Sequence, residues 1–403
     1  MLYGALVRAL SMLDFKPDGE TAHDHFFATF AKFGPAATRE GDMLAEIMSR
    51  AAADHTLYLE LMTSPGMGDA RALGKKIGER GDYADTYKAL LTGPNGIDAI
   101  AAEVSKEMNA RELRAQEILH CNEPPKRMPG CDVTVRYLAQ IIRGFAPQQV
   151  FAEDVLAFRL VENDPRFVGL NIVGPEDDVI ALHDYAQHMK MFGFLHGLDG
   201  AVKMSLHAGE LVAGQRGGLA HVKPADLKFH VRQAVEVAHA NRIGHGVDIM
   251  GETNAGALIK EMAQKRILVE INLTSNAQIL GVSGESHPFM AYRRAGVPVA
   301  LSTDDEGVER IDLTHEYVRA ARTYRLSYAE LKALSRNALE YSFLPGRSLW
   351  YDPSTYMAAG ACAGVALGAD PHGECEAFLA QSEKAQLQWK LEAKFRKFEE
   401  GSP

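Results

Sequence analysis

The chain has 403 residues, of which 46% are hydrophobic and 24% are charged. These proportions are typical of a globular protein with a sizeable core, and they exclude a disordered or collagen-like chain. The 53 acidic and 43 basic residues give a net charge of −10, which disfavours nucleic acid and anionic membranes as main partners. A small neutral or cationic substrate fits this charge better.

Residues 1–13 are apolar apart from Arg8 and Ser11, a pattern that predicts an amphipathic helix and not a signal peptide. No apolar run reaches the ~18 residues that a membrane-spanning helix needs. Farther along, seven apolar or β-branched runs alternate with segments of helical spacing, which predicts βα units and a parallel sheet. The predicted strands are 56–65, 131–140, 167–174, 202–210, 242–249, 267–276 and 297–305, and the clearest helices are 39–53, 177–192, 226–241, 326–344 and 383–400.

Chemically distinctive residues follow several of these strands, as they do in a parallel α/β barrel of the TIM type. Such a barrel closes with eight strands, and seven are predicted here. A doubly wound dinucleotide-binding sheet is disfavoured, because no Gly-x-Gly-x-x-Gly loop follows the first predicted strand. Since no linker divides the chain, we expect one barrel domain over 1–345 and a helical extension over 346–403 that packs on it.

The four cysteines form two local pairs, Cys121 with Cys131 and Cys362 with Cys375. Neither pair has the spacing of a zinc finger. Each pair could close a loop as a disulfide in an oxidising compartment, while four free thiols are equally compatible with a cytosolic protein of this size.

Four short motifs at predicted strand ends carry most of the chemical information. One histidine at a strand end is more often structural than functional, but four motifs in order indicate a site. Zinc in hydrolases takes imidazole and carboxylate ligands, which His207 and Asp304 can supply, and the reaction also needs an acid and a base. Glu210 can face a substrate as the proton donor. The motifs are HAGE at 207–210, GHG at 244–246, TSN at 274–276 and STDD at 302–305.

These motifs, in this order, resemble those of the adenosine deaminase family of metal-dependent hydrolases, and the resemblance covers nearly the whole chain. It implies zinc as the cofactor, with His207 and Asp304 as ligands. It further implies that Glu210 protonates purine N1 and that His245 holds and deprotonates the attacking water. The segments that carry the resemblance include DHTLYLELMTSP, FVGLNIVGPED, SLHAGE, RIGHG, NLTSN and HPFMAYRRAGVPVALSTDD.

The resemblance also implies how a purine nucleoside is bound. Asp305 would share a hydrogen with purine N7, and the backbone N–H of Gly174 would donate to N3. Phe27 and Phe30 would belong to an apolar helix that gates the pocket, although core packing alone explains their spacing. Ser275 and Asn276 would orient the groups that hold the metal.

One departure from the family concerns its first barrel strand, which ends in His-x-His and gives two further zinc ligands. His23 and His25 could be that pair, but the residues before them do not alternate as a strand does. The alternative places both at the start of the gating helix, with the first strand absent from this chain. We then expect an incomplete barrel, weak zinc binding and a longer natural protein, periplasmic or secreted if it carries a signal peptide and cytoplasmic otherwise.

The leading functional prediction is zinc-dependent hydrolytic deamination of adenosine or deoxyadenosine to inosine and ammonia. Another adenine compound, such as adenine, AMP or a thio-substituted adenosine, is the second possibility. A purine-binding or growth-factor-like protein without catalysis is the third.

Overall fold

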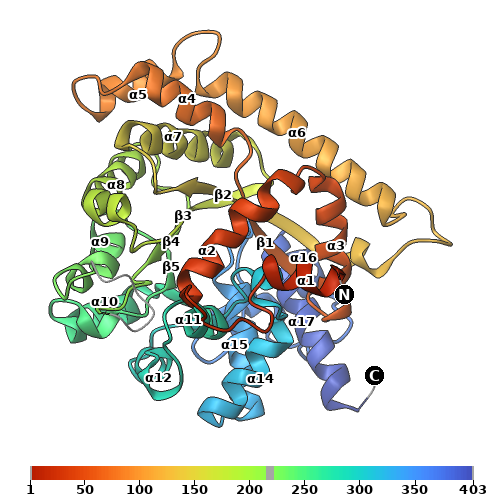
Figure 1. Cartoon of the computed structure of the whole chain (residues 1–403). Coiled ribbons are helices and arrows are strands. Elements are labelled where there is room, and N and C mark those ends of the chain that lie inside the picture. The colour runs from red at the N-terminus through yellow and green to blue at the C-terminus, as the bar shows by residue number, and fades with distance from the viewer. Residues whose placement is uncertain (1, 215–221, 402–403) are drawn as a thin grey trace.

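The computed structural model describes residues 2–214 and 222–401. Its seven main strands all run parallel and are flanked by helices, which confirms the predicted α/β class (Figure 1). The strands are β1 (Tyr58–Thr63), β2 (Thr134–Ile142), β3 (Phe167–Val173), β4 (Ser205–Ala208), β5 (Arg242–His245), β6 (Leu268–Ile271) and β7 (Val299–Leu301).

Most of the helices lie between or after these strands. They are α1 (Leu2–Ala9), α2 (Ala22–Phe33), α3 (Glu40–Ala53), α4 (Met67–Ile77), α5 (Tyr83–Leu91), α6 (Ile97–Ile118), α7 (Pro147–Asn163), α8 (Val179–Leu198), α9 (His230–Glu236), α10 (Ala255–Lys265), α11 (Leu273–Ile279), α12 (Phe289–Arg294), α13 (Glu306–Glu309), α14 (Leu313–Tyr324), α15 (Tyr328–Glu340), α16 (Gly373–Ala380) and α17 (Glu383–Glu399). No described helix is long and apolar enough to cross a membrane.

The strands pair in chain order, as they do in an α/β barrel. One set of pairings joins β1, β2 and β3, a second joins β4 to β7, and a bridge between Leu170 and Met204 links the two sets. Within the described ranges, β7 is not hydrogen-bonded to β1, so the ring of pairings is open at that point. The predicted barrel with seven strands therefore agrees with the structure.

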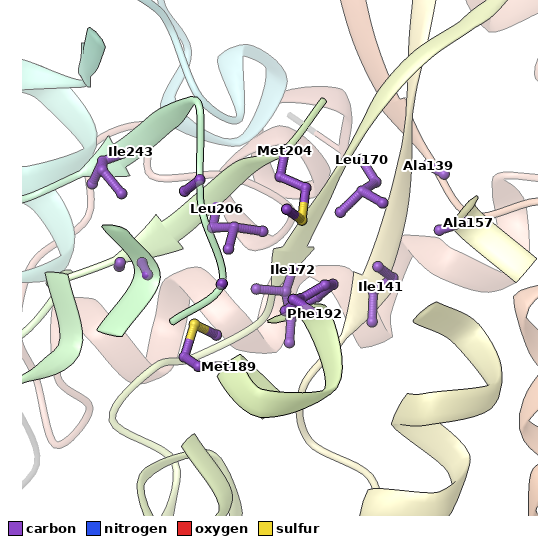
Figure 2. Packing of buried hydrophobic residues seen from close by; sticks show 14 of the residues in the cluster. Ala139, Ile141, Ala157, Leu170, Ile172, Met189, Phe192, Met204, Leu206 and Ile243 are labelled. Carbon is purple, nitrogen blue, oxygen red and sulfur yellow. The ribbon is translucent and has the colours of Figure 1, made fainter. Parts of the chain in front are cut away.

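The core lies between the strands and the helices outside them. All seven residues of β3 are buried, as expected for a parallel strand that is covered on both faces. Figure 2 shows Ile172 of β3 beside Phe192 of α8, with Leu206 of β4 nearby. This packing fixes where the carboxyl end of each strand lies, and therefore where the strand-end side chains meet.

The interior near the amino ends of the strands is charged. Arg242 of β5 forms ion pairs with Glu60 of β1, at 2.6 Å, and with Glu270 of β6, at 2.7 Å. Its guanidinium also stacks on the ring of Phe343, 3.8 Å from the ring centroid. A buried charge is tolerated only when it is paired, and these contacts pair Arg242 with two carboxylates.

The amino-terminal segments cover the opposite, carboxyl end of the strands. The helix predicted over 1–13 is confirmed as α1, although it ends at Ala9. Helix α2 begins after Thr21, whose side chain caps it by accepting the N–H of Asp24 at 3.0 Å. Phe26 of α2 is buried among Val247, Ile279 and neighbouring apolar residues, so α2 is anchored over the strand ends.

The strand predicted over 267–276 is wrong in its second half. Strand β6 ends at Ile271 and α11 begins at Leu273, so the TSN motif lies on a helix. The buried carboxylate of Glu316 accepts the backbone N–H groups of Leu273 and Thr274, at 2.8 and 3.3 Å. The N–H groups of a first helical turn have no carbonyl partner within the helix, so the hydrogen bonds to Glu316 stabilise the start of α11.

The carboxyl-terminal residues form a smaller core of their own. Leu349, Trp350, Phe378 and Trp389 are among its buried members, and a short antiparallel pair, β8 (Trp350–Asp352) and β9 (Met357–Ala358), lies beside it. Helix α17 packs on α15 of the barrel, where Arg336 binds Glu392 through two hydrogen bonds of 2.7 Å.

Both cysteine pairs are bonded as disulfides in the structure. The Cys362–Cys375 disulfide is buried in the carboxyl-terminal core. Replacing both of these cysteines with Ser is expected to lower the free energy of unfolding by about 3 kcal/mol, because a cross-link over a loop of this size restricts the unfolded chain. Denaturant titration without reductant, with the Cys121→Ser/Cys131→Ser protein alongside, measures this. An unchanged transition midpoint would contradict it.

Candidate active site

Three donor groups converge at the carboxyl ends of the strands. His207 lies in β4, His245 ends β5, and Asp304 follows β7 by three residues. One ligand atom from each lies within 4.8 Å of the other two, and the two imidazole centroids are 4.7 Å apart. His245 and Asp304 both have positive φ values, 66° and 56°, which non-glycine residues seldom adopt. Such conformations also occur at helix caps, and they recur at active sites.

The ring of His207 is fixed by Asn171 of β3. The side-chain oxygen of Asn171 accepts both the backbone N–H and the ring Nδ1–H of His207, each at 3.0 Å. Because Nδ1 donates, the lone pair of the neutral ring is on Nε2. Burial, then the neighbouring His245 and Arg143, lower the pKa of His207 well below its usual value, so the ring is neutral and can bind a metal ion through Nε2.

A chain of hydrogen bonds determines which nitrogen of His245 carries the proton. In this ring Nδ1 is the acceptor, whereas in His207 it is the donor. The backbone N–H of Phe289 donates to Nδ1 of His287 at 3.1 Å, so His287 carries its proton on Nε2 and donates it to Asn276 Oδ1 at 3.0 Å. Burial lowers the pKa of His287 to about 4, in keeping with a neutral ring. The amide nitrogen of Asn276 then donates to Nδ1 of His245 at 2.8 Å. Nε2 of His245, 3.7 Å from Asp304, is left as the N–H of a neutral ring.

Glu210 is the acidic group nearest these donors. Its carboxyl is buried and lies 3.3 Å from Nδ1 of His245. Burial raises the pKa of Glu210 well above its usual value, and the negative charges of Asp304 and Glu176 raise it further. A carboxyl group with such a pKa holds its proton near neutral pH, as a general acid must.

Asp304 and Asp305 differ in their surroundings. Asp304 accepts a hydrogen bond of 2.7 Å from the hydroxyl of Ser275, which confirms the predicted contact from the TSN motif. Burial, followed by the charge of Asp304, raises the pKa of Asp305 well above its usual value. Asp305 is therefore a neutral acid, able to donate a hydrogen bond to a ring nitrogen.

These groups face one large cavity of about 1510 Å³. The cavity continues from the strand ends along the space between β1 and β7 and is mostly apolar. His245 is fully buried behind it and does not contribute to the lining. The lining includes the other residues predicted from sequence, which are Phe27, Phe30, Gly174, His207, Glu210, Asp304 and Asp305.

His23 and His25 do not join the donor group, so the interpretation of these histidines as metal ligands is wrong. Nε2 of His23 lies 3.0 Å from a carboxylate oxygen of Asp177, in the loop after β3. His25 contacts Glu20 and the carbonyl of Ser11. Both lie in the first turn of α2, which confirms the alternative that they stand at the start of the helix that carries Phe27 and Phe30.

The donor set fits a metal ion. Two imidazoles and a carboxylate at this separation are typical zinc ligands. His207 presents a free lone pair, whereas Nδ1 of His245 already accepts a hydrogen bond from Asn276. His207 and Asp304 are therefore the groups that would hold the metal, and His245 would stand beside it as a hydrogen-bonding partner.

Sequence reasoning missed the residues that support this site from behind. Asn171, Arg143 and Glu176 lie on or directly after β2 and β3, where the same strand-end rule would have marked them. Arg143 is 1% exposed, and one of its nitrogens donates to the carbonyls of Ile172 and His207. The signal of Asn171 and Arg143 was weak because each is a single polar residue in an apolar segment, and Glu176 stands in a run of three acidic residues that is typical of a helix start.

Side chains that can hold a metal ion at the carboxyl ends of parallel barrel strands are typical of metal-dependent hydrolases. Within that class, the family model described as adenosine deaminase matches residues 39–348. The chain belongs to the adenosine deaminase family and is an aminohydrolase.

Individual relatives agree with this assignment. The chain is 30% identical over 270 residues to an adenine deaminase of Rhizobium leguminosarum, a match that covers 65% of this chain and 76% of the relative. It is 24% identical over 294 residues to an adenosine deaminase of Clostridium perfringens, covering 67% and 81%. Among solved structures, the adenine deaminase of Arthrobacter aurescens has the same fold, with a TM-score of 0.54, 16% identity and coverage of 85% and 90%. The N6-methyl-AMP deaminase of Arabidopsis thaliana is similar, with a TM-score of 0.53, 22% identity and coverage of 80% and 79%.

Proposed function

We propose that the protein is a zinc-dependent deaminase that hydrolyses adenosine or deoxyadenosine to inosine and ammonia. The observation that carries this proposal is the position of the protonated Glu210 beside the donor group of His207, His245 and Asp304, at one end of the cavity. A carboxylic acid beside a metal site can protonate a ring nitrogen and make the adjacent carbon electrophilic.

The roles of the individual residues follow from their protonation. Glu210 would donate a proton to purine N1, and Asp305 would donate a hydrogen bond to N7. Zinc held by His207 and Asp304 would supply Lewis acidity that lowers the pKa of a water molecule toward about 7. His245, held by Asn276, would orient that water for attack on C6 through its Nε2–H. Because that nitrogen already carries a proton, the expected role of His245 as the base does not fit this tautomer, and the carboxylate of Asp304 would take the proton that the water loses.

Aromatic residues of α2 and the Gly174 backbone would hold the purine. Phe27 and Phe30 offer apolar surface for a flat base. Gly174 has a φ of 98°, which a residue with a side chain seldom adopts, and it lines the cavity. Its N–H is the group that the family resemblance assigns to purine N3.

The charge of the cavity supports a nucleoside over a nucleotide. Of the described residues that line it, seven are acidic and Arg242 alone carries a permanent positive charge. Arg242 is already paired with Glu60 and Glu270, at the amino ends of the strands. Glu210 and Asp305 hold their protons, so what opposes a phosphate is that it would find no unpaired cation among the described lining residues.

Two proteins that this chain resembles indicate a second class of candidate substrate, which comprises adenine and adenine nucleotides. The Rhizobium relative is an adenine deaminase, and an Arabidopsis structure of the same fold, with a TM-score of 0.54, is a complex with IMP. That activity and that ligand belong to the two related proteins. For this chain, the cavity extends well beyond the volume of a base, which supports a substrate that carries a sugar.

Ammonia release from adenosine, deoxyadenosine, adenine, AMP and N6-methyl-AMP tests the proposal. With zinc-loaded protein, kcat/KM for adenosine is expected to exceed that for AMP by at least about 100-fold, the equivalent of ~2.7 kcal/mol for leaving a phosphate unpaired. A higher value for AMP would move the substrate to the nucleotide class. Binding of adenosine without ammonia release, by protein with stoichiometric zinc, would contradict the proposal and support a non-catalytic purine-binding protein.

A further inference from the structure

A buried cluster of three charged or ionisable residues lies behind the loop that carries Glu210. Glu176 follows β3, Arg143 follows β2, and His230 begins α9. Glu176 and Arg143 are 2% and 1% exposed, and His230 is fully buried. Nδ1 of His230 lies 2.5 Å from one oxygen of Glu176, and a guanidinium nitrogen of Arg143 lies 3.7 Å from the other.

The two oxygens of Glu176 also bind the backbone of the HAGE motif. One accepts the N–H of Gly209 and the other accepts the N–H of Glu210, each at 2.9 Å. Arg143 donates to the carbonyl of His207 at 2.8 Å, so the cluster holds the same loop from two sides. The backbone of Glu210 is thereby fixed at its own nitrogen.

The loop is packed closely at this point. Gly209 has a φ of 76°, and a Cβ placed there would come within 2.3 Å of a carboxyl oxygen of Asp248. A side chain at position 209 would therefore meet Asp248. The loop is held here by the two hydrogen bonds to Glu176, together with the hydrogen bond that the Asp248 N–H donates to the Gly209 carbonyl at 3.0 Å.

Glu176 is suited to accept both hydrogen bonds. Burial alone would raise the pKa of Glu176, but the hydrogen bond from His230 and the charge of Arg143 lower it to about 2. An ionised carboxylate offers acceptors on both oxygens, and hydrogen bonds to a charged group are about twice as strong as neutral ones. Glu176 is absent from the described lining of the cavity, so it does not contact the substrate.

We propose that Glu176 is a positioning residue, which holds the backbone of Gly209 and Glu210 so that the Glu210 carboxyl is aimed at the substrate. This inference rests on the proposed function of Glu210 as the proton donor. Glu176 acts through Glu210, and its contribution is to the rate of proton transfer and not to substrate binding.

The test compares Glu176→Gln, Glu210→Gln and the double variant with the wild-type protein. Gln at position 176 keeps the shape but offers one carbonyl oxygen for two N–H donors, so kcat for adenosine is expected to fall about 100-fold while KM changes less than about threefold. If Glu176 acts through Glu210, the double variant is expected to be no slower than Glu210→Gln alone. Glu392→Gln removes the charge of a buried carboxylate that is paired with Arg336 and does not line the cavity, and it serves as the matched control.

Hydrogen exchange gives a readout that does not depend on activity. Exchange at the amides of Gly209 and Glu210 is expected to accelerate at least about tenfold in Glu176→Gln, while amides of β5 keep their protection. General loosening would raise exchange in β5 as well, and would contradict a positioning role.

The outcomes separate this inference from the proposed function. If the zinc-loaded wild-type protein releases no ammonia from any adenine compound, the proposed function fails, and with it the catalytic role assigned to Glu176. If the wild-type protein is active and Glu210→Gln is not, two results would overturn the positioning role alone. One is an unchanged kcat in Glu176→Gln, and the other is a double variant whose loss equals the product of the two single losses.

Discussion

Glu210→Gln is expected to lower kcat for adenosine by about 10²- to 10⁴-fold, the range that a general acid contributes. The amide has the size of the carboxyl group but has no acidic proton to give to N1. It can still donate a hydrogen bond to that nitrogen, so KM is expected to change less than about threefold. Steady-state measurement of ammonia release over a range of adenosine concentrations gives both parameters. A variant with more than about a tenth of the wild-type kcat would contradict the assignment of Glu210 as the acid.

The matched control for this variant is Glu309→Gln. Burial, followed by the charge of Asp304, raises the pKa of Glu309 to about 11, so it is also a protonated carboxyl near the site. Glu309 is not among the described residues that line the cavity. Its replacement is expected to leave kcat within about threefold of the wild-type value, the size of change usual for a residue outside the reaction.

The pH dependence of thermal stability shows whether Glu210→Gln loses activity through its chemistry or through a folding defect. Because the folded-state pKa of Glu210 is raised, the folded protein holds a proton that the unfolded chain releases above a pH of about 4.3. Wild-type stability therefore falls as the pH rises from that value toward the folded-state pKa, and the uncharged amide removes this loss. Thermal denaturation is expected to show the variant gaining on the wild-type protein between pH 5 and pH 8. A variant that loses stability relative to wild type over this range would contradict the raised pKa.

The centre of the site could be predicted from sequence because parallel strands place their carboxyl ends together. His207, His245 and Asp304 are far apart in the chain, yet each follows or ends a run that reads as a buried strand. The pattern of buried strands in the sequence therefore predicted that these three side chains lie close together. The order of the motifs, through the family resemblance, supplied the roles.

Other parts depend on contacts that no local pattern encodes. The turn after β6 becomes helix because Glu316, more than forty residues later, accepts the first N–H groups of α11. The contact of Glu176 with His230 depends on where α9 lies, and that position is set by packing across the barrel. The helices α4, α5 and α6 between β1 and β2 were not predicted, since their apolar residues do not stand out from the surrounding segments.

The gap in strand pairing between β7 and β1 lies beside the candidate active site. The cavity extends between the edges of these two strands and reaches the donor group, so whatever lies along those edges also borders the metal site. An unpaired strand edge presents free N–H and C=O groups that readily pair with another strand. Occupancy of that space would therefore change both the closure of the barrel and the access of solvent to Asp304.

Asp304→Asn is expected to weaken zinc binding at least about 100-fold and to lower kcat by about 10³-fold. Asp304 contributes the carboxylate of the donor group, and it adopts a φ of 56° that Asn tolerates at least as well as Asp. The change therefore removes the negative charge while keeping the backbone conformation and the hydrogen bond from Ser275. Zinc content after dialysis against a buffered metal solution, measured beside activity, tests this expectation.

Asp305→Asn is the matched variant, because it removes a neighbouring carboxyl group that is already neutral. Burial and the charge of Asp304 hold the pKa of Asp305 high, so the amide changes little of the field at the metal. Zinc binding in Asp305→Asn is therefore expected to stay within about threefold of the wild-type value while KM for adenosine rises about 10-fold, since a donor to N7 is altered. Equal loss of zinc from both variants would show that the pair acts as one charged unit, and full zinc occupancy in Asp304→Asn would exclude Asp304 as a ligand.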